Sequence, residues 1–125
     1  MLLPIEVANS LSYEIADNLS YNEMLVLSEE VRTAGKKRRA YTSTEESPIE
    51  NYEMAARIVT EDIPALIMLA RIAEKVHRVA LWFKKSGSIK DAPLDDLVDI
   101  SVISRLIAAN YIIPLIRQEA SDVRS

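Results

Sequence analysis

The chain has 125 residues, of which 49% are hydrophobic, with a formal net charge of −4 at pH 7 and no cysteine. These values predict one compact folded domain, residues 1–125, and exclude disulfides, thiolate metal sites and cysteine nucleophiles. Two glycines and a single histidine exclude a Gly-rich phosphate loop and a multi-histidine metal site. The negative charge disfavours general nucleic-acid binding.

Apolar residues recur at helical spacing along almost the whole chain, and no segment shows the sustained alternation of a strand. The first helix is predicted over about residues 4–18, within an N-terminal segment 1–19. The second starts at a capping box in which Ser20 and Glu23 cap each other. Gly35 leaves two ends open for this helix, which either stops there or runs on into the four cations of "KKRR".

The third and fourth helices follow a polar loop. "SPIE" (residues 47–50) is a second capping box and predicts a short amphipathic helix to residue 59. The fourth helix is predicted to begin near Thr60 or Asp62 and to end before Gly87. Its first half, "IPALIMLA", is apolar on all sides and is therefore expected to be buried all round.

The fifth helix begins at Pro93 and becomes apolar on every face from Val102 to Ile116. Pro114 is expected to kink or end it, and residues 121–125 to form a frayed tail. The predicted fold is an all-α compact bundle of about five helices, with the fourth and fifth central. A chain of 125 residues has too few other residues to cover both of these helices on every face, which favours a homo-oligomer over a tightly wrapped monomer.

Two segments were candidates for export or membrane insertion. "MLLPIEVANS" carries no basic residues before its apolar ones, so it does not resemble a signal peptide. The stretch between Arg105 and Arg117 has eleven uncharged residues, too few to span a bilayer. We therefore predict a cytoplasmic protein without membrane association.

Three acids open the fifth helix in "PLDDLVD". Asp95, Asp96 and Asp99 stand close enough in helical register for their carboxylates to share one face. Such a cluster suits a hard divalent cation like magnesium. The alternative is that acids in a first turn stabilise the helix dipole, which explains Asp95 and Asp96 better than it explains Asp99.

Cations form the polar stripe of the fourth helix. Arg71, Lys75 and Arg78 share a face, and Glu74 is placed to pair with Arg78 at i+4. The cations suit a phosphate ligand. The alternative is that they pair with the aspartates of the fifth helix, because the short "GSIKDAP" connector makes the two helices antiparallel neighbours.

The order of "KKRRAYTS", "ESPIENYEMAA" and "ARIAEKVHRVALWFKKSGSIKDAPLDDLVDISV" resembles the nucleotide modification associated domain family of small, all-helical, phage-encoded proteins. The resemblance covers roughly residues 28–109. It implies a protein associated with nucleotide metabolism, with ligand-binding residues at Arg39, Tyr41, Asn51, Lys75 and Arg78. The last motif departs from the family at positions 100 and 101, which are Ile-Ser where Asn-Tyr is usual.

A more distant likeness is to the all-helical nucleoside triphosphate pyrophosphohydrolases of the MazG type, which hold magnesium with acids on two helices. Asp96 and Asp99 match the second acidic motif, while Glu29 and Glu30 match the start of the first, with Thr33 where a further acid would stand. This likeness implies magnesium bound by Asp96, Asp99, Glu29 and Glu30, with Asp96 and Asp99 as catalytic residues.

Two functions follow. In the first, the protein binds a nucleotide phosphate and hydrolyses it with magnesium. In the second, it is a non-enzymatic phage interaction protein that binds a host protein or captures a signalling nucleotide. "KKRRAY" is either a solvated helix end or a lid that brings Arg39 and Tyr41 over the carboxylates. Paired carboxylates would favour the second function.

Overall fold

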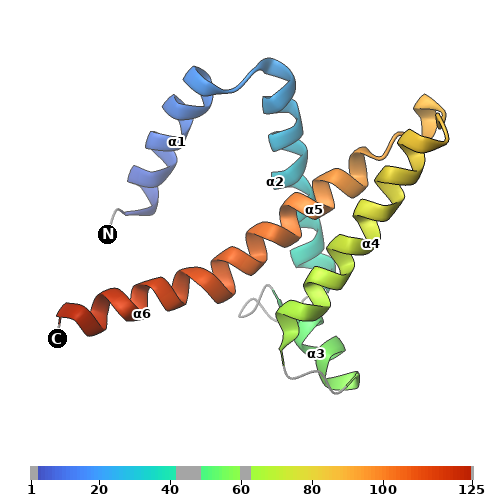
Figure 1. The fold of residues 1–125 in the computed structure, drawn as a ribbon. Coiled ribbons are helices and arrows are strands. Elements are labelled where there is room, and N and C mark those ends of the chain that lie inside the picture. The colour runs from blue at the N-terminus through green and yellow to red at the C-terminus, as the bar shows by residue number, and fades with distance from the viewer. Residues whose placement is uncertain (1–2, 42–48, 60–62, 125) are drawn as a thin grey trace.

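The computed structural model describes residues 3–41, 49–59 and 63–124, with the side chains of 37–41, 50–51 and 123–124 left out of that description. All of its regular elements are helical, which confirms the predicted fold class (Figure 1). In chain order they are α1 (Pro4–Asn18), α2 (Tyr21–Tyr41), α3 (Glu50–Ile58), α4 (Pro64–Lys84), the 3₁₀ turn η1 (Ile89–Asp91), α5 (Leu94–Ile107), the π-helix η2 (Ala108–Ile112) and α6 (Ile113–Arg124).

The helices α4 and α5 form the centre of the molecule, as predicted. They pack against each other, α2 packs on α5, and α3 packs on α4. By contrast, α1 and α6 project from this centre on the same side, and α1 makes no extended packing with another described element (Figure 1). The fold is thus a packed group of four helices with two arms.

Local chemistry explains where α2 begins and how far it runs. The amide of Glu23 donates to Ser20 Oγ and the amide of Ser20 donates to Glu23 Oε1, both at 3.2 Å, so the predicted capping box is present. The helix then continues through Gly35 to Tyr41. Ser47, Thr60 and Asp62, the predicted cap residues of the next two helices, lie outside the described residues; α3 begins at Glu50 after Ile49, and α4 begins at Pro64 after Ile63.

The turn after α4 depends on a glycine. The helix ends at Lys84, and Ser86 adopts a left-handed conformation with φ of 49°. Trp82 folds back over this turn, and its Nε1 donates to the carbonyl of Ser88 at 3.1 Å. A Cβ atom at Gly87 would collide with the indole ring of Trp82, so only glycine allows so close an approach.

The long C-terminal helix passes Pro114 without ending. Proline lacks the N–H that would bond to residue 110, and its ring crowds that carbonyl in a regular α-helix. The five residues Ala108–Ile112 just before it are π-helical, which widens the turn. The helix therefore runs on as α6 to Arg124, and α5, η2 and α6 together account for the fifth predicted helix.

One continuous stretch, Ile89–Asp122, is long and apolar enough to cross a membrane by length and composition alone. It is 34 residues long, well beyond the eleven uncharged residues considered above, and little of its most apolar window is buried. Core helices of soluble proteins satisfy the same length and composition, so the cytoplasmic location stays a prediction.

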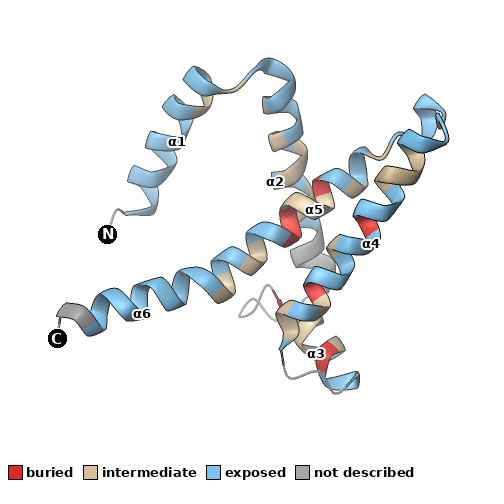
Figure 2. Ribbon diagram, in the orientation of Figure 1, coloured by how far each residue is buried: buried red, intermediate tan, exposed pale blue. Residues whose placement is uncertain are grey.

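The core is small. Met68 of α4, Ile103 of α5 and Ile49 are buried together, with Ile72 and Tyr111 packed against them. In α1 no residue is buried, and most of α6 is exposed (Figure 2). The expectation that the first half of the fourth helix, residues 63–70, is buried all round is wrong for the single chain, because α5 and α3 cover only part of its circumference and leave Leu66 and Leu69 exposed.

Candidate functional site

The contact between α4 and α5 gathers the charged residues singled out from the sequence. Lys75 Nζ donates to Asp99 Oδ2 at 2.8 Å and lies 3.8 Å from Asp96 Oδ1. Both aspartates come from the first turns of α5, where the short η1 connector brings them beside α4. The predicted alternative, that the cations of one helix pair with the acids of the other, is therefore realised for this lysine.

Lys75 is almost wholly covered, with 6% of its surface exposed. It stands on the inward face of α4 in register with Met68 and Ile72, a position that an apolar residue would normally hold. A buried ammonium is tolerated only with a close counter-charge and hydrogen bonds. The side chains of Asp99 and Asp96, which are 16% and 22% exposed, supply that charge.

The two arginines of the stripe are used differently. Arg78 Nη2 lies 3.8 Å from Asp96 Oδ1, an ion pair too long for a hydrogen bond. Glu74 was expected to pair with Arg78, but it accepts a hydrogen bond from Arg71 Nη1 at 3.1 Å. The reason is that the side chain of Arg78 is directed toward Asp96 of α5, so Glu74 pairs with Arg71, one turn earlier on α4.

Tyr52 of α3 joins this cluster, although it was not among the expected site residues. Burial raises the pKa of its hydroxyl, Arg71 opposes that rise, and the negative charge of Asp99 adds to it. The tyrosine thus faces the charged groups of two other helices. A weak signal for Tyr52 was present in the sequence, since it directly follows Asn51, one of the ligand residues that the family resemblance implies.

The two glutamates predicted to bind metal, Glu29 and Glu30, have different partners from each other and from the two aspartates. Glu30 Oε1 accepts hydrogen bonds from Ser101 Oγ at 2.5 Å and from Arg105 Nη2 at 2.6 Å. Glu29 pairs with Arg32 on the surface of α2. Within the described part of the chain, no three His, Asp or Glu side chains are grouped as metal ligands. Ser101, where the sequence departs from the motif that it resembles, and Arg105 thus connect α5 to α2 through Glu30.

Three further predicted ligand residues are placed only by their backbones. Arg39 and Tyr41 belong to the last turns of α2, and Asn51 to the first turn of α3. The positions of their side chains lie outside the described residues. Because α2 remains helical through Tyr41, the backbone of "KKRRAY" is the end of a helix and not a loop, which agrees with the first of the two interpretations of this segment.

The opposite side of α4 is apolar and exposed. Six residues at alternating spacings of three and four form this outer stripe: Leu66, Leu69, Ala73, Val76, Ala80 and Phe83. The four large ones are 47%, 50%, 50% and 67% exposed. This is the heptad spacing with which one helix packs against another. The spacing is visible in the sequence, but for its first two residues, Leu66 and Leu69, the apolar stretch 63–70 predicts burial on all faces.

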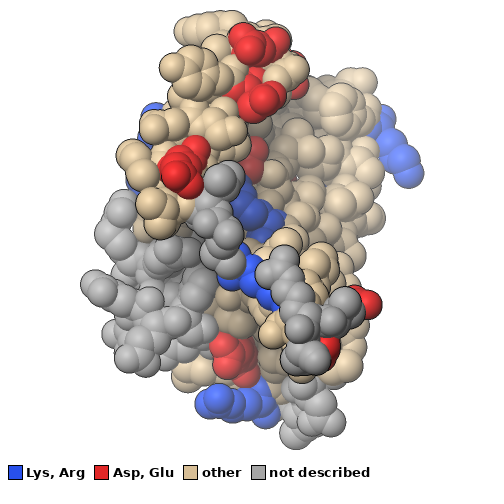
Figure 3. Space-filling view, turned by 90° about the vertical axis from the view of Figure 1, so that its left-hand side faces the viewer, with Lys and Arg blue, Asp and Glu red and all other residues tan. Residues whose placement is uncertain are grey.

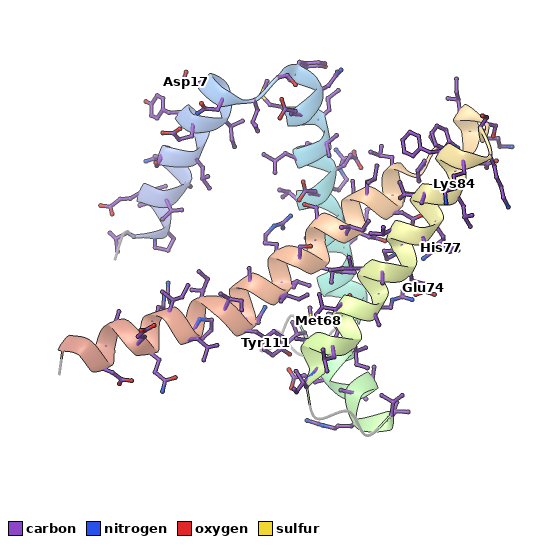
Figure 4. The ribbon with its side chains drawn as sticks, in the orientation of Figure 1. Asp17, Met68, Glu74, His77, Lys84 and Tyr111 are labelled. Atoms are coloured by element: carbon purple, nitrogen blue, oxygen red, sulfur yellow. The ribbon has the colours of Figure 1, made fainter. Side chains whose placement is uncertain are left out.

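A tyrosine within the π-helix η2, Tyr111, has a buried hydroxyl. Tyr111 packs against the core near Met68 (Figure 4). Its hydroxyl is buried without a hydrogen-bond partner among the described residues. Burial raises the pKa of this hydroxyl and the charge of Glu53 adds to the rise. Burial raises this pKa because removal from water disfavours the charged phenolate.

The chain matches no protein-family model, no curated protein and no solved structure.

Proposed function

We propose that this protein is a non-enzymatic interaction protein that binds an apolar helix of another polypeptide chain along the outer stripe of α4. The observation that carries the proposal is the occupation of the predicted catalytic carboxylates. Asp99 is hydrogen-bonded to a buried lysine, and Asp96 lies between that lysine and Arg78. The charged cluster thus has a role in holding α4 to α5, and the outer stripe of α4 is an exposed apolar surface available to a partner.

The electrostatics of the cluster support a structural role. A magnesium ion at Asp96 and Asp99 would have to sit beside the ammonium of Lys75, which lies within 2.8 Å of one carboxylate and 3.8 Å of the other. Two like charges at such distances repel by several kcal/mol in a partly buried setting, roughly 4 kcal/mol at 4 Å for unit charges. Metal binding would therefore require the lysine to leave.

The stripe has the properties of a helix-binding surface. Its large residues repeat every three or four positions over residues 66–83, a length of about 26 Å. Amphipathic helices dock on such surfaces through residues at the same spacing. Glu74 and His77 lie on the side of α4 away from α5, so charged and polar residues border the stripe (Figure 4).

A variant of one carboxylate separates this function from catalysis. With nucleoside triphosphates and magnesium, we expect no phosphate release from the wild type, and an Asp99→Asn variant with a lowered melting temperature. Turnover by the wild type that Asp99→Asn abolishes would contradict the proposal. Surface-exposed Asp95→Asn is the matched control, because Asp95 has the same charge one turn earlier on α5 and is exposed.

A second function, nucleotide-phosphate binding, is favoured by one observation. The guanidinium of Arg78 is half exposed and stands 3.8 Å from Asp96, so this ion pair leaves its N–H groups available to an anion. Calorimetric titration with a panel of nucleotides, with and without magnesium, tests it. Heat that Arg78→Gln removes would support phosphate binding, and no heat with any nucleotide would reject it.

A further inference from the structure

The chain exposes far more surface than its mass requires. Its solvent-accessible area is 9766 Å² for 14.0 kDa, whereas a compact monomer of that mass exposes about 6,700 Å². The excess is about 3,000 Å². Obligate protein interfaces bury roughly 2,000–5,000 Å² over both partners, or half of that on each. The surface available on one chain is therefore enough for an obligate dimer.

The arm α1 contributes to this excess. This helix has 15 residues, none of them buried, and makes no extended packing with another described element. An isolated helix of this length is marginal in water, since most helical stability in proteins comes from packing of the apolar face. That face exists: Ile5, Ala8, Leu11 and Ile15 lie on one side of α1. For α1 to be stable, its apolar face must pack against another apolar surface.

The outer stripe of α4 fits α1 in length and in charge. The 15 residues of α1 span about 22 Å, against about 26 Å for the stripe. α1 carries three acids and no lysine or arginine, a net −3. α4 carries four cations and one glutamate, a net +3 that Asp96 and Asp99 reduce to +1. Opposite charges favour and steer the pairing of two such helices.

The same charges disfavour a lipid surface as the occupant. Helices that lie in an anionic membrane interface are rich in lysine and arginine on their polar face. The polar face of α1 has Glu6, Glu14 and Asp17 instead. Acidic side chains gather toward the upper end of the face on which the arms project (Figure 3). An acidic helix is repelled by anionic lipid and attracted by α4.

Within one chain, α1 and α4 lie on opposite sides of α2 and α5 (Figure 1). We infer that the apolar face of α1 covers the outer stripe of α4 in a second copy of this chain. When the second copy returns the contact, the result is a closed two-fold dimer with two identical α1–α4 contacts. This inference rests on the proposed function in one respect, since it names the helix that the stripe binds.

Sedimentation equilibrium of the full chain over micromolar concentrations tests the inference. We expect twice the mass of 14.0 kDa. A glutamate in either contact, Leu11→Glu or Val76→Glu, should raise the dimer dissociation constant at least about tenfold, because it places a charge in an apolar interface. Tyr13→Glu and Ile89→Glu are matched controls, because each adds one glutamate at an exposed position off the two faces, and both should leave the dissociation constant close to that of the wild type.

Because the chain has no native cysteine, introduced cysteines can be used to test the contact by disulfide cross-linking. The double variant Leu11→Cys, Val76→Cys should form disulfide-linked dimers on oxidation, while the pair Tyr13→Cys, Val76→Cys should not. Any of three results would overturn the inference: a monomer at every concentration, a cross-link confined to one chain, or a monomer that floats with phosphatidylserine vesicles. A monomer whose helix-binding is lost in Val76→Glu would still leave the proposed function standing.

Discussion

Replacing Lys75 with methionine tests whether the charged cluster is structural. The side chain keeps its length but loses the ammonium that Asp99 contacts at 2.8 Å. Breaking a buried ion pair by removing one partner costs about 3–5 kcal/mol. Because Asp99 and Asp96 retain 16% and 22% exposure, water compensates part of this loss. We expect the free energy of unfolding to fall by roughly 2–4 kcal/mol, or about 8–15 °C in Tm.

The assay is urea unfolding followed by circular dichroism at one fixed protein concentration, because dimerisation makes stability depend on concentration. The double variant Lys75→Met, Asp99→Asn removes both charges and should recover a good part of the loss, which a double-mutant cycle measures as coupling. A loss below about 1 kcal/mol for Lys75→Met, or no coupling between the two positions, would refute a structural role for the cluster.

Three other predictions concern the framework. Glu30→Gln weakens two charge-assisted hydrogen bonds between α2 and α5 and should lower the free energy of unfolding by about 1–2 kcal/mol in urea titrations. Glu29 forms only an exposed ion pair, so the control Glu29→Gln should lower it by less than about 0.5 kcal/mol. Equal losses in the two variants would contradict this assignment. Gly87→Ala should cost about 1–3 kcal/mol and shift the fluorescence of Trp82, because the new methyl meets the indole; unchanged emission would be the wrong result. Burial raises the pKa of Tyr52, so its neutral form is favoured in the folded state. Stability should therefore fall as pH rises through about 10, and less steeply in Tyr52→Phe, as pH-dependent urea titrations would show.

Helical periodicity and capping chemistry predicted most of the fold. The 3.6-residue pattern and the box of Ser20 and Glu23 are local, so they placed α1 and the start of α2 without knowledge of the rest. At Gly35 the sequence is compatible with two helix ends, and at Pro114 it predicts a kink or an end, whereas the helix continues past both positions. Both positions weaken a helix by amounts that packing or a π-turn can offset, and local sequence does not determine that outcome.

The candidate site was predictable only in part, for a reason of geometry. Helical spacing brought Lys75, Arg78, Asp96 and Asp99 onto facing surfaces, because the connector between their helices is short. Which cation takes which acid depends on the rotation of α4 about its axis, which packing alone sets. The same rotation decides that Met68 is buried while the outer stripe is exposed, so an all-apolar segment could not reveal which side stays open.

The central claim is that this chain is an interaction protein whose exposed helices bind another helix. Hydrogen exchange of the α1 amides tests this claim most directly. The amides of residues 4–18 are followed by mass spectrometry in the full chain at low and high micromolar concentration. If α1 is covered by a second copy, its amides are protected at high concentration and lose protection on dilution. Rapid exchange at both concentrations, with α4 and α5 protected, would contradict the account.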